Sequence, residues 1–171
     1  MFGETLFPLN QLKDSNPSLY KEHVKKYEGR EKLLLRKVPL LDCLWNDVIH
    51  LSPINPQIIL DIFKEKELVP EIRRGEVFET YKIPIQNLNE DQIVCFQSFN
   101  FDPNNFDPSL NKFWKFDRNS YEELKSVPKE QVDVWLSDKA AGRVLFWYSH
   151  TMHILYRGSI DISACEIINC S

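Results

Sequence analysis

Residues 143–170 read RVLFWYSHTMHILYRGSIDISACEIINC and are rich in aromatic and β-branched side chains. The runs 143–149 and 152–157 are β-rich and are separated by a short turn, a pattern that predicts a β-hairpin. Further apolar runs at 160–162 and 165–169 follow. We therefore expect a block of strands here, and we expect four of its side chains to supply core: Phe146, Trp147, Ile154 and Ile167.

Helices are predicted upstream of this block. Asn16-Pro17 and Asn55-Pro56 each place a capping residue before a proline at the first helical position. A capping box at 120–123 predicts a short helix. Pro128 begins another helix, which Gly142 ends.

Three further strands are predicted, at 45–51, 77–83 and 93–99. In the first, Trp45, Ile49 and Leu51 fall on one side and Val48 on the other. The mixture predicts a single α+β domain over residues 1–171, with a mixed or mainly antiparallel sheet, several short helices and a C-terminal β-hairpin block.

Composition limits the classes of function. The chain has 171 residues, a net charge of −4 and no run of apolar residues long enough to span a membrane. An acidic chain argues against general nucleic-acid binding, which needs many cations to neutralise phosphates. No segment resembles an export signal, so we expect a soluble cytoplasmic protein without membrane attachment. The four cysteines are then expected to be reduced.

Several cofactor and catalytic motifs are absent from the sequence. No two of the five glycines are neighbours, so neither phosphate-cradling loop motif is present. There is no G-x-S-x-G nucleophile motif and no C-x-x-C pair. His150 and His153 lie three residues apart, which on a regular strand points them to opposite faces. We therefore expect no metal and no cofactor.

His50 is the candidate catalytic residue. It comes near the end of the strand predicted at 45–51, just before a turn and a helix, where active-site residues are common in α/β layers. The alternative is a histidine that only satisfies a backbone carbonyl at the strand end.

The stretch His50-Leu51-Ser52, followed by an apolar helix, resembles the first nicotinamide-dinucleotide-binding stretch of ADP-ribosyltransferase-like proteins. The resemblance implies that His50 and Ser52 hold a ribose of NAD. It also implies that a glutamate on a later strand assists transfer, and Glu166 is the candidate. The glycine usual after that helix is missing, because Lys66-Glu67-Leu68 stands there.

Residues 100–119 are predicted to form a long loop, with two Asp-Pro turns and several aromatic side chains. Long loops in compact domains are often functional, and aromatic rings on them can anchor a partner. The candidate binding residues are Phe101, Phe106, Phe113 and Trp114. In the alternative interpretation these rings fold back and cap the core.

Residues 21–37 carry a net charge of +4, which leaves −8 on the rest of the chain. A phosphate-bearing ligand could bind there, with Arg30 and Arg36 as the contacts. The alternative is a solvated helix face, since three glutamates are interleaved.

Two functional hypotheses follow, and the sequence leaves open whether the protein is an enzyme. The first is a non-enzymatic binding or protein-interaction module that contacts a protein partner through residues 100–119. The second is an ADP-ribosyltransferase-like or other nucleotide-ligand enzyme that uses His50 and a late glutamate, with NAD as its cofactor. An open pocket beside His50 is the observation that bears most on this choice.

Overall fold

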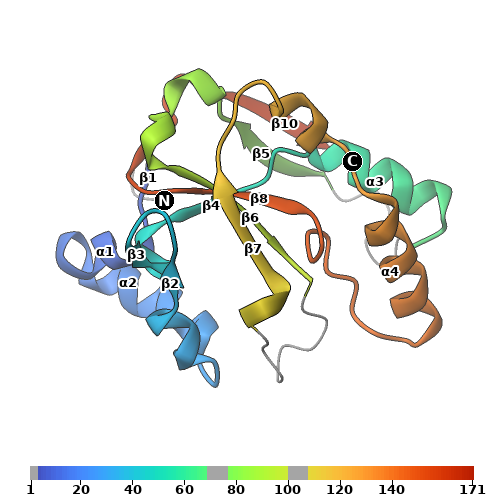
Figure 1. Cartoon of the computed structure of the whole chain (residues 1–171), viewed down its shortest axis with the longest axis horizontal. Helices are drawn as coiled ribbons and strands as arrows, with labels where there is room; N and C mark the ends of the chain where they lie inside the picture. Colours follow the sequence, from blue (N-terminus) through green and yellow to red (C-terminus); the bar gives the residue numbers. More distant parts are fainter. Residues whose placement is uncertain (1–3, 69–76, 100–107) are drawn as a thin grey trace.

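The computed structural model describes residues 4–68, 77–99 and 108–171. A four-stranded antiparallel sheet lies at the centre of a compact α+β fold, with a pair of helices on each side of it (Figure 1). The strand order is β4 (Ile49–Leu51), β8 (Met152–Tyr156), β6 (Ile93–Ser98) and β7 (Asn111–Lys115). The strand predicted at 93–99 is confirmed, and it lies between two partners.

Both faces of this sheet are covered. Alternation along the strands places Val94, Phe96 and Leu155 in a cluster on one face, whereas Ile93 and Ile154 belong to a cluster on the other. This double cover explains why four consecutive residues at the start of β6 are buried. In β4 only His50 shares the face of Phe96, because His50 pairs with Leu155, which pairs with Val94.

The first pair of helices is N-terminal: α1 (Leu9–Ser15) and α2 (Pro17–Val24). The side chain of Asn16 accepts a hydrogen bond of 3.1 Å from the backbone N–H of Leu19, which confirms the predicted cap. The 3-10 helix η1 (Lys25–Tyr27) continues directly from α2.

The second pair consists of α3 (Pro56–Glu65) and α4 (Lys129–Ala140). Asn55 caps α3 as expected, and Gly142 adopts a φ of 65° just after α4, a conformation that favours glycine. The two helices meet where the rings of Phe63 and Trp135 pack edge to face, 4.7 Å apart.

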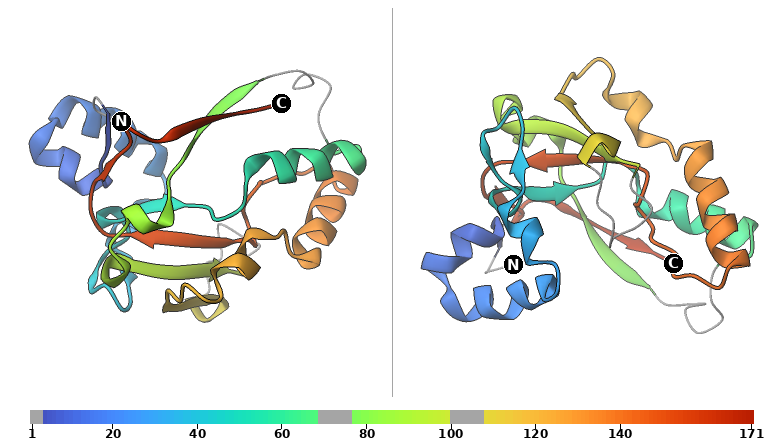
Figure 2. Two further views of the ribbon diagram at one scale, coloured as in Figure 1. Left: turned by 90° about the horizontal axis from the view of Figure 1, so that it is seen from above. Right: turned by 60° about the horizontal axis from the view of Figure 1, so that its bottom comes forward.

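Three two-stranded antiparallel sheets complete the fold. They pair β1 (Thr5–Leu6) with β9 (Ile160–Asp161), β2 (Lys37–Val38) with β3 (Cys43–Leu44), and β5 (Phe78–Lys82) with β10 (Glu166–Cys170). Figure 2 shows the β5–β10 ribbon lying apart from the four-stranded sheet. Every strand pair among the described residues is antiparallel, in line with the expected mainly antiparallel sheet.

The C-terminal block is rich in strands, but the hairpin expected at 143–157 is wrong. Residues 143–149 contain no strand, and β8 pairs with β4 and β6 instead. Two side chains of α4 bind the backbone in and just after this segment: Trp135 Nε1 donates to the carbonyl of Phe146, and Gln131 Oε1 accepts from the backbone N–H of His150.

The core expected from this block is only partly correct. Ile154 is buried and Trp147 packs against the α3–α4 core. Phe146 and Ile167, in contrast, are 62% and 50% exposed. Ile167 lies on the two-stranded ribbon, where its pairing partner Tyr81 is exposed as well.

The strand predicted at 45–51 is shorter than expected. The 3-10 helix η3 (Trp45–Asp47) replaces its first half, and only β4 is extended. Because this turn resets the alternation, Trp45 packs with Val48 on one face of the sheet while Ile49 and Leu51 pack on the other. The expected grouping of Trp45 with Ile49 and Leu51 is therefore wrong.

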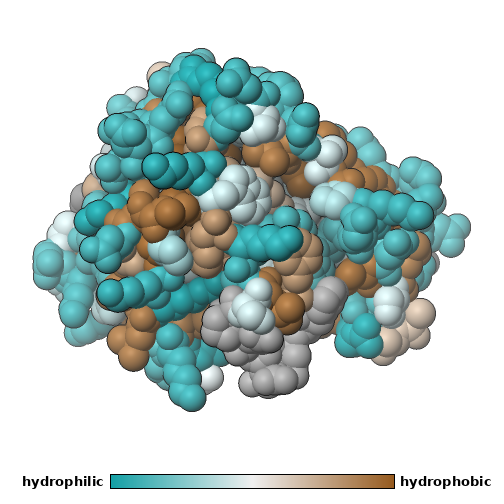
Figure 3. All heavy atoms as spheres, in the orientation of Figure 1, coloured by the Kyte–Doolittle hydropathy of each residue, from teal (hydrophilic) through white to brown (hydrophobic). Residues whose placement is uncertain are grey.

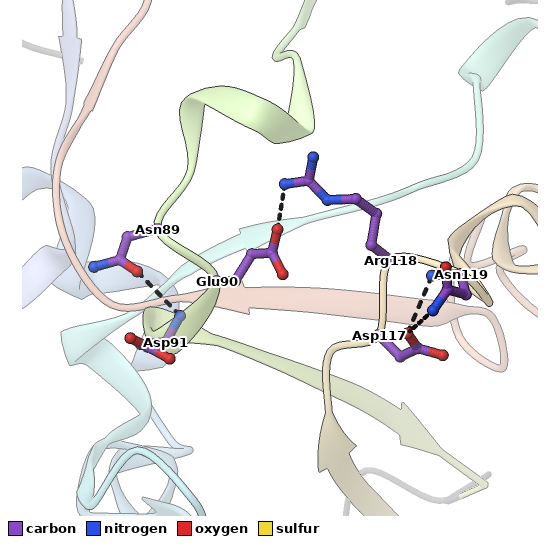
Figure 4. Close-up of polar contacts among 6 residues, drawn as sticks. All are labelled: Asn89, Glu90, Asp91, Asp117, Arg118 and Asn119. Carbon is purple, nitrogen blue, oxygen red and sulfur yellow. Dashed lines mark hydrogen bonds and ion pairs between the residues drawn. The ribbon is translucent and has the colours of Figure 1, made fainter.

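The long loop predicted at 100–119 is interrupted by β7, which pairs with β6 over five residues. The capping box at 120–123 does not form an α-helix: η8 (Tyr121–Lys125) is a 3-10 helix, and the Ser120 hydroxyl donates to the carbonyl of Asp117. Close by, an ion pair joins Arg118 to Glu90 of η6 (Glu90–Gln92), which ties the turn after β7 to the turn before β6 (Figure 4).

Three more 3-10 helices connect the elements: η2 (Glu31–Leu35), η5 (Ile85–Asn87) and η7 (Pro108–Leu110). No helix within the described ranges is long and apolar enough to cross a membrane. On the face drawn in Figure 3, hydrophilic side chains surround small hydrophobic patches. All four cysteines are free thiols, as expected.

Candidate functional site

A pocket of about 400 Å³ lies between the N-terminal helices and the β4 edge of the central sheet. Among the described residues β4 is an edge strand, which pairs with β8 on one side only. The pocket is lined by Phe7, Leu9, Leu12, His23, Lys26, Tyr27, Trp45, Asn46, Val48, Ile49 and His50.

One wall comes from α1, α2 and η1. Leu9 and Leu12 are one helical turn apart and are both buried, so α1 presents an apolar surface. His23, Lys26 and Tyr27 follow at the spacing that puts residues on one face of a helix. This wall is therefore apolar at one end and basic at the other.

The opposite wall is η3 and β4. The carboxylate of Asp47 holds η3 in place: one oxygen accepts from the backbone N–H of Leu44 and the other from Asn10 Nδ2, both at 2.7 Å. Since Asn10 belongs to α1, this contact ties the two walls together. It also fixes the turn that carries Trp45 and Asn46.

Asn46 is the most unusual side chain of the pocket. It is 4% exposed, and its Oδ1 has no hydrogen-bond partner among the described residues. A buried polar atom left without a partner costs about 1–3 kcal/mol, so such atoms are rare in folded proteins. Asn46 thus places a buried amide oxygen without a partner in a residue of the pocket wall.

His50 lies at the mouth of the pocket and keeps contact with solvent. The protein around it nevertheless displaces much of the water that a charged ring would need, and this desolvation lowers the pKa of His50 to about 4. His153 on the same face of the sheet adds to the decrease, while the Trp45 carbonyl, 3.5 Å from Nε2, opposes it. At neutral pH the imidazole is therefore uncharged.

Next to His50 lies an aromatic cluster that contains a half-buried cation. The Arg36 guanidinium lies 4.3, 5.0 and 5.6 Å from the ring centres of Trp45, Phe96 and Phe113. Burial lowers the pKa of Arg36 to about 10, so it remains charged at neutral pH. The imidazole of His50 also packs on Trp45, with ring centres 4.4 Å apart. The ring of Trp45 is thus held between several neighbours.

The chemistry of the lining is simple. Lys26 is its one formally charged side chain at neutral pH, with His23 next to it, and none of the eleven residues is Asp, Glu, Ser, Thr or Cys. The pocket can thus offer hydrogen bonds, a positive charge and an apolar surface.

The residues that the resemblance singled out are not brought together. His50 lines the pocket, but Ser52 does not, and its Oγ accepts a hydrogen bond from the N–H of Ile54 at the start of the turn before α3. Glu166 lies on β10, where its carboxylate pairs with Lys82 at 2.8 Å, and it does not line the pocket.

Two of the four aromatic candidates of 100–119 lie within the described residues. Phe101 and Phe106 lie outside the described residues. Phe113 packs against the core cluster of the central sheet, and Trp114 is half-buried opposite Cys95. Phe113 thus supports the alternative in which these rings cap the core.

The two arginines of the basic stretch do not line the pocket. Arg30 donates to the carbonyl of Lys26, and Arg36 packs among the rings described above. His23 and Lys26 line it instead. The charge of 21–37 was the available signal, but which of its cations face inward depends on the packing of α1 against α2.

His150 precedes β8 and His153 lies within it, so the two histidines do not share the regular strand on which the prediction of opposite faces depended. The N–H of His150 is bound by Gln131, whereas the His153 ring lies 5.9 Å from Phe96 and its Nε2 lies 2.9 Å from the Tyr148 carbonyl. Within 4–68, 77–99 and 108–171, no group of three or more His, Cys, Asp or Glu side chains could hold a metal ion.

Three comparisons with known proteins were made. A scan against family models, a search of curated proteins and a search of solved structures each found no match. The pocket is therefore interpreted from its own geometry.

Proposed function

We propose that this protein is a non-enzymatic binding module that takes a small ligand in the pocket beside His50. The observation that carries the proposal is the pocket itself, about 400 Å³ in volume and lined by apolar side chains with a few polar groups. Sites for small molecules are concave, mostly apolar and usually preformed, and range over roughly 300–1,000 Å³.

The titratable groups of the lining favour binding over catalysis. A histidine with a pKa of about 4 is a weak general base at neutral pH, where an efficient base has a pKa near 7. Desolvation raises the pKa of Tyr27, so its phenol stays protonated. The lining offers no carboxylate, hydroxyl nucleophile other than this phenol, or thiol.

The enzymatic alternative has less support. Transfer in the ADP-ribosyltransferase style needs a glutamate next to the ribose that His50 would hold. Glu166 pairs with Lys82 on the β5–β10 ribbon and does not line the pocket.

Native mass spectrometry of protein equilibrated with a small-molecule cell extract tests the proposal. We expect wild type to retain a non-covalent small-molecule adduct, and we expect His23→Trp to lose it. His23 is half-buried in the pocket wall, so the larger ring fills the cavity without entering the core. Lys21→Trp is the matched control, because Lys21 is exposed on the same helix and does not line the pocket.

Two results would overturn the proposal. The first is that folded wild type retains no adduct at all. The second is that His23→Trp retains the same adduct as wild type. Thermal unfolding of both variants checks that each is folded.

A further inference from the structure

The choice of ligand depends first on Asn46, the buried amide of the pocket wall. Asn46 lines the cavity, is 4% exposed, and has a side-chain oxygen without a partner among the described residues. An asparagine amide carries an acceptor and two donors side by side. Its natural complement is a planar group with a donor and an acceptor on one edge, as a nucleobase has.

The positive charge at one end of the pocket favours an anionic group on the ligand. Lys26, the charged side chain of the lining, lies one helical turn from His23, and none of the lining residues carries a carboxylate. An ammonium on a flexible stem is a common binder of phosphate. The overall charge of −4 argues against a polyanion, so a single small anion is the better match.

The remaining walls suit a flat apolar surface. Leu9, Leu12, Val48 and Ile49 are aliphatic, and the accessible imidazole of His50 is a flat ring at the pocket mouth. Trp45 is less available, because Arg36 and His50 already pack on its ring. A base between these aliphatic side chains and His50 would leave water on binding.

We infer that the ligand is a nucleoside monophosphate, with its base edge on the Asn46 amide and its phosphate at Lys26 and His23. This inference rests on the proposed binding function and adds the class of ligand to it. The pocket volume of about 400 Å³ lies toward the lower end of the range for small-molecule sites, in line with one nucleotide rather than a dinucleotide.

Isothermal titration calorimetry with three probes tests the inference: AMP, adenosine and ribose 5-phosphate. AMP contains both recognition groups, and each of the other two contains one. We expect AMP to bind at least about tenfold more tightly than either fragment, since each lost polar contact removes part of the binding free energy. Equal binding of AMP and ribose 5-phosphate, or no binding of AMP, would overturn the inference.

Two variants assign the contacts. Lys26→Ala should weaken AMP about tenfold and leave adenosine unchanged, whereas Asn46→Leu should weaken AMP and adenosine but not ribose 5-phosphate. Lys25→Ala is the matched control, because Lys25 is exposed, adjacent in sequence and outside the lining. Lys26 is itself exposed, so its variant remains informative even if Asn46→Leu does not fold. The opposite assignment, with Lys26→Ala weakening adenosine, would contradict the proposed orientation.

This test is separable from that of the binding function. If the extract yields a pocket adduct but AMP does not bind, the ligand class is wrong and the binding function stands. If no adduct forms and AMP does not bind, both fail.

Discussion

Two buried amides, Gln131 on α4 and Asn46 in η3, differ in the hydrogen bonds that they make. Gln131 is 0% exposed and Asn46 is 4% exposed, so burial hardly separates them. Gln131 Oε1 accepts from the N–H of His150 at 2.6 Å, and the Ser149 hydroxyl lies 3.3 Å from the same amide. Asn46 Oδ1 has no such partner among the described residues.

The two amides therefore differ in what they contribute to the fold. Gln131 holds the segment after α4 against the helix, so its hydrogen bonds are part of the fold. Asn46 Oδ1 makes no hydrogen bond among the described residues, and in the proposed function a ligand supplies that bond. Since buried polar groups are nearly always satisfied, the exception carries more functional information than burial or charge does.

The largest effect is expected from Gln131→Met, which removes the hydrogen bonds of the amide that holds the fold. Methionine keeps the length of the side chain but leaves the N–H of His150 without its acceptor. A buried donor left unpaired costs about 1–3 kcal/mol, so the free energy of unfolding should fall by about 2 kcal/mol. In a chain of 171 residues this lowers Tm by roughly 4–8 °C. Urea titration and calorimetry measure both quantities.

The control is Gln11→Met, the same replacement at an exposed position of α1. Its effect on stability should stay within about 0.5 kcal/mol. If both variants lose the same stability, the loss comes from methionine itself, and Gln131 has no special structural role.

A smaller effect of the opposite sign is expected from Asn46→Leu in the absence of ligand. Leucine has a similar volume and removes the unpaired buried oxygen. The free energy of unfolding should therefore stay the same or rise by up to about 1 kcal/mol. Chemical denaturation of the ligand-free protein measures this change.

Asn10→Leu is the comparison for Asn46→Leu. It is the same replacement at an asparagine whose side chain does make a hydrogen bond, of 2.7 Å to Asp47. Losing a bond to a carboxylate should cost about 1.5–3 kcal/mol if its partner stays buried, and less here because Asp47 is only half-buried. A loss of more than about 1 kcal/mol in Asn46→Leu would mean that Asn46 supports the fold, and its assignment to a ligand would fail.

Local signals predicted much of the fold. The Asn-Pro pairs before α2 and α3 were identified because capping depends on neighbouring residues only. The predicted strand 93–99 was found because a run buried on both faces is apolar throughout. The hairpin predicted at 143–157 did not form because the backbone of Phe146 and His150 is bound by Trp135 and Gln131, and this tertiary contact overrides β propensity.

The candidate site was predictable in part. His50 was singled out by its place before a turn and helix, and it does line a pocket. Asn46 could not be found, because its role depends on the absence of partners, which only a structure reveals. Lys26 could not be told apart from the six other cations of 21–37, since the packing of the N-terminal helices decides which of them line the pocket.

The smallest expected effect is the change in stability with pH that comes from His50 in the pocket. The pKa of His50 in the folded state, about 4, is below its ordinary value of 6.5. Between these two pH values the unfolded chain binds more protons than the folded one. The free energy of unfolding is therefore highest above pH 6.5 and decreases as the pH falls toward 4. His150 and His153 also have lowered pKa values, both mainly through burial, and contribute in the same direction.

His50→Gln should therefore reduce the loss of stability between pH 7.5 and pH 5 without abolishing it. Because His50 keeps contact with solvent, its share should be no more than about 1 kcal/mol. Urea titrations of wild type and variant at both pH values measure it. The difference between the proteins at pH 7.5, where both side chains are neutral, reports packing alone. Only the change in that difference at pH 5 reports titration, and an unchanged difference would mean that the pocket does not desolvate His50.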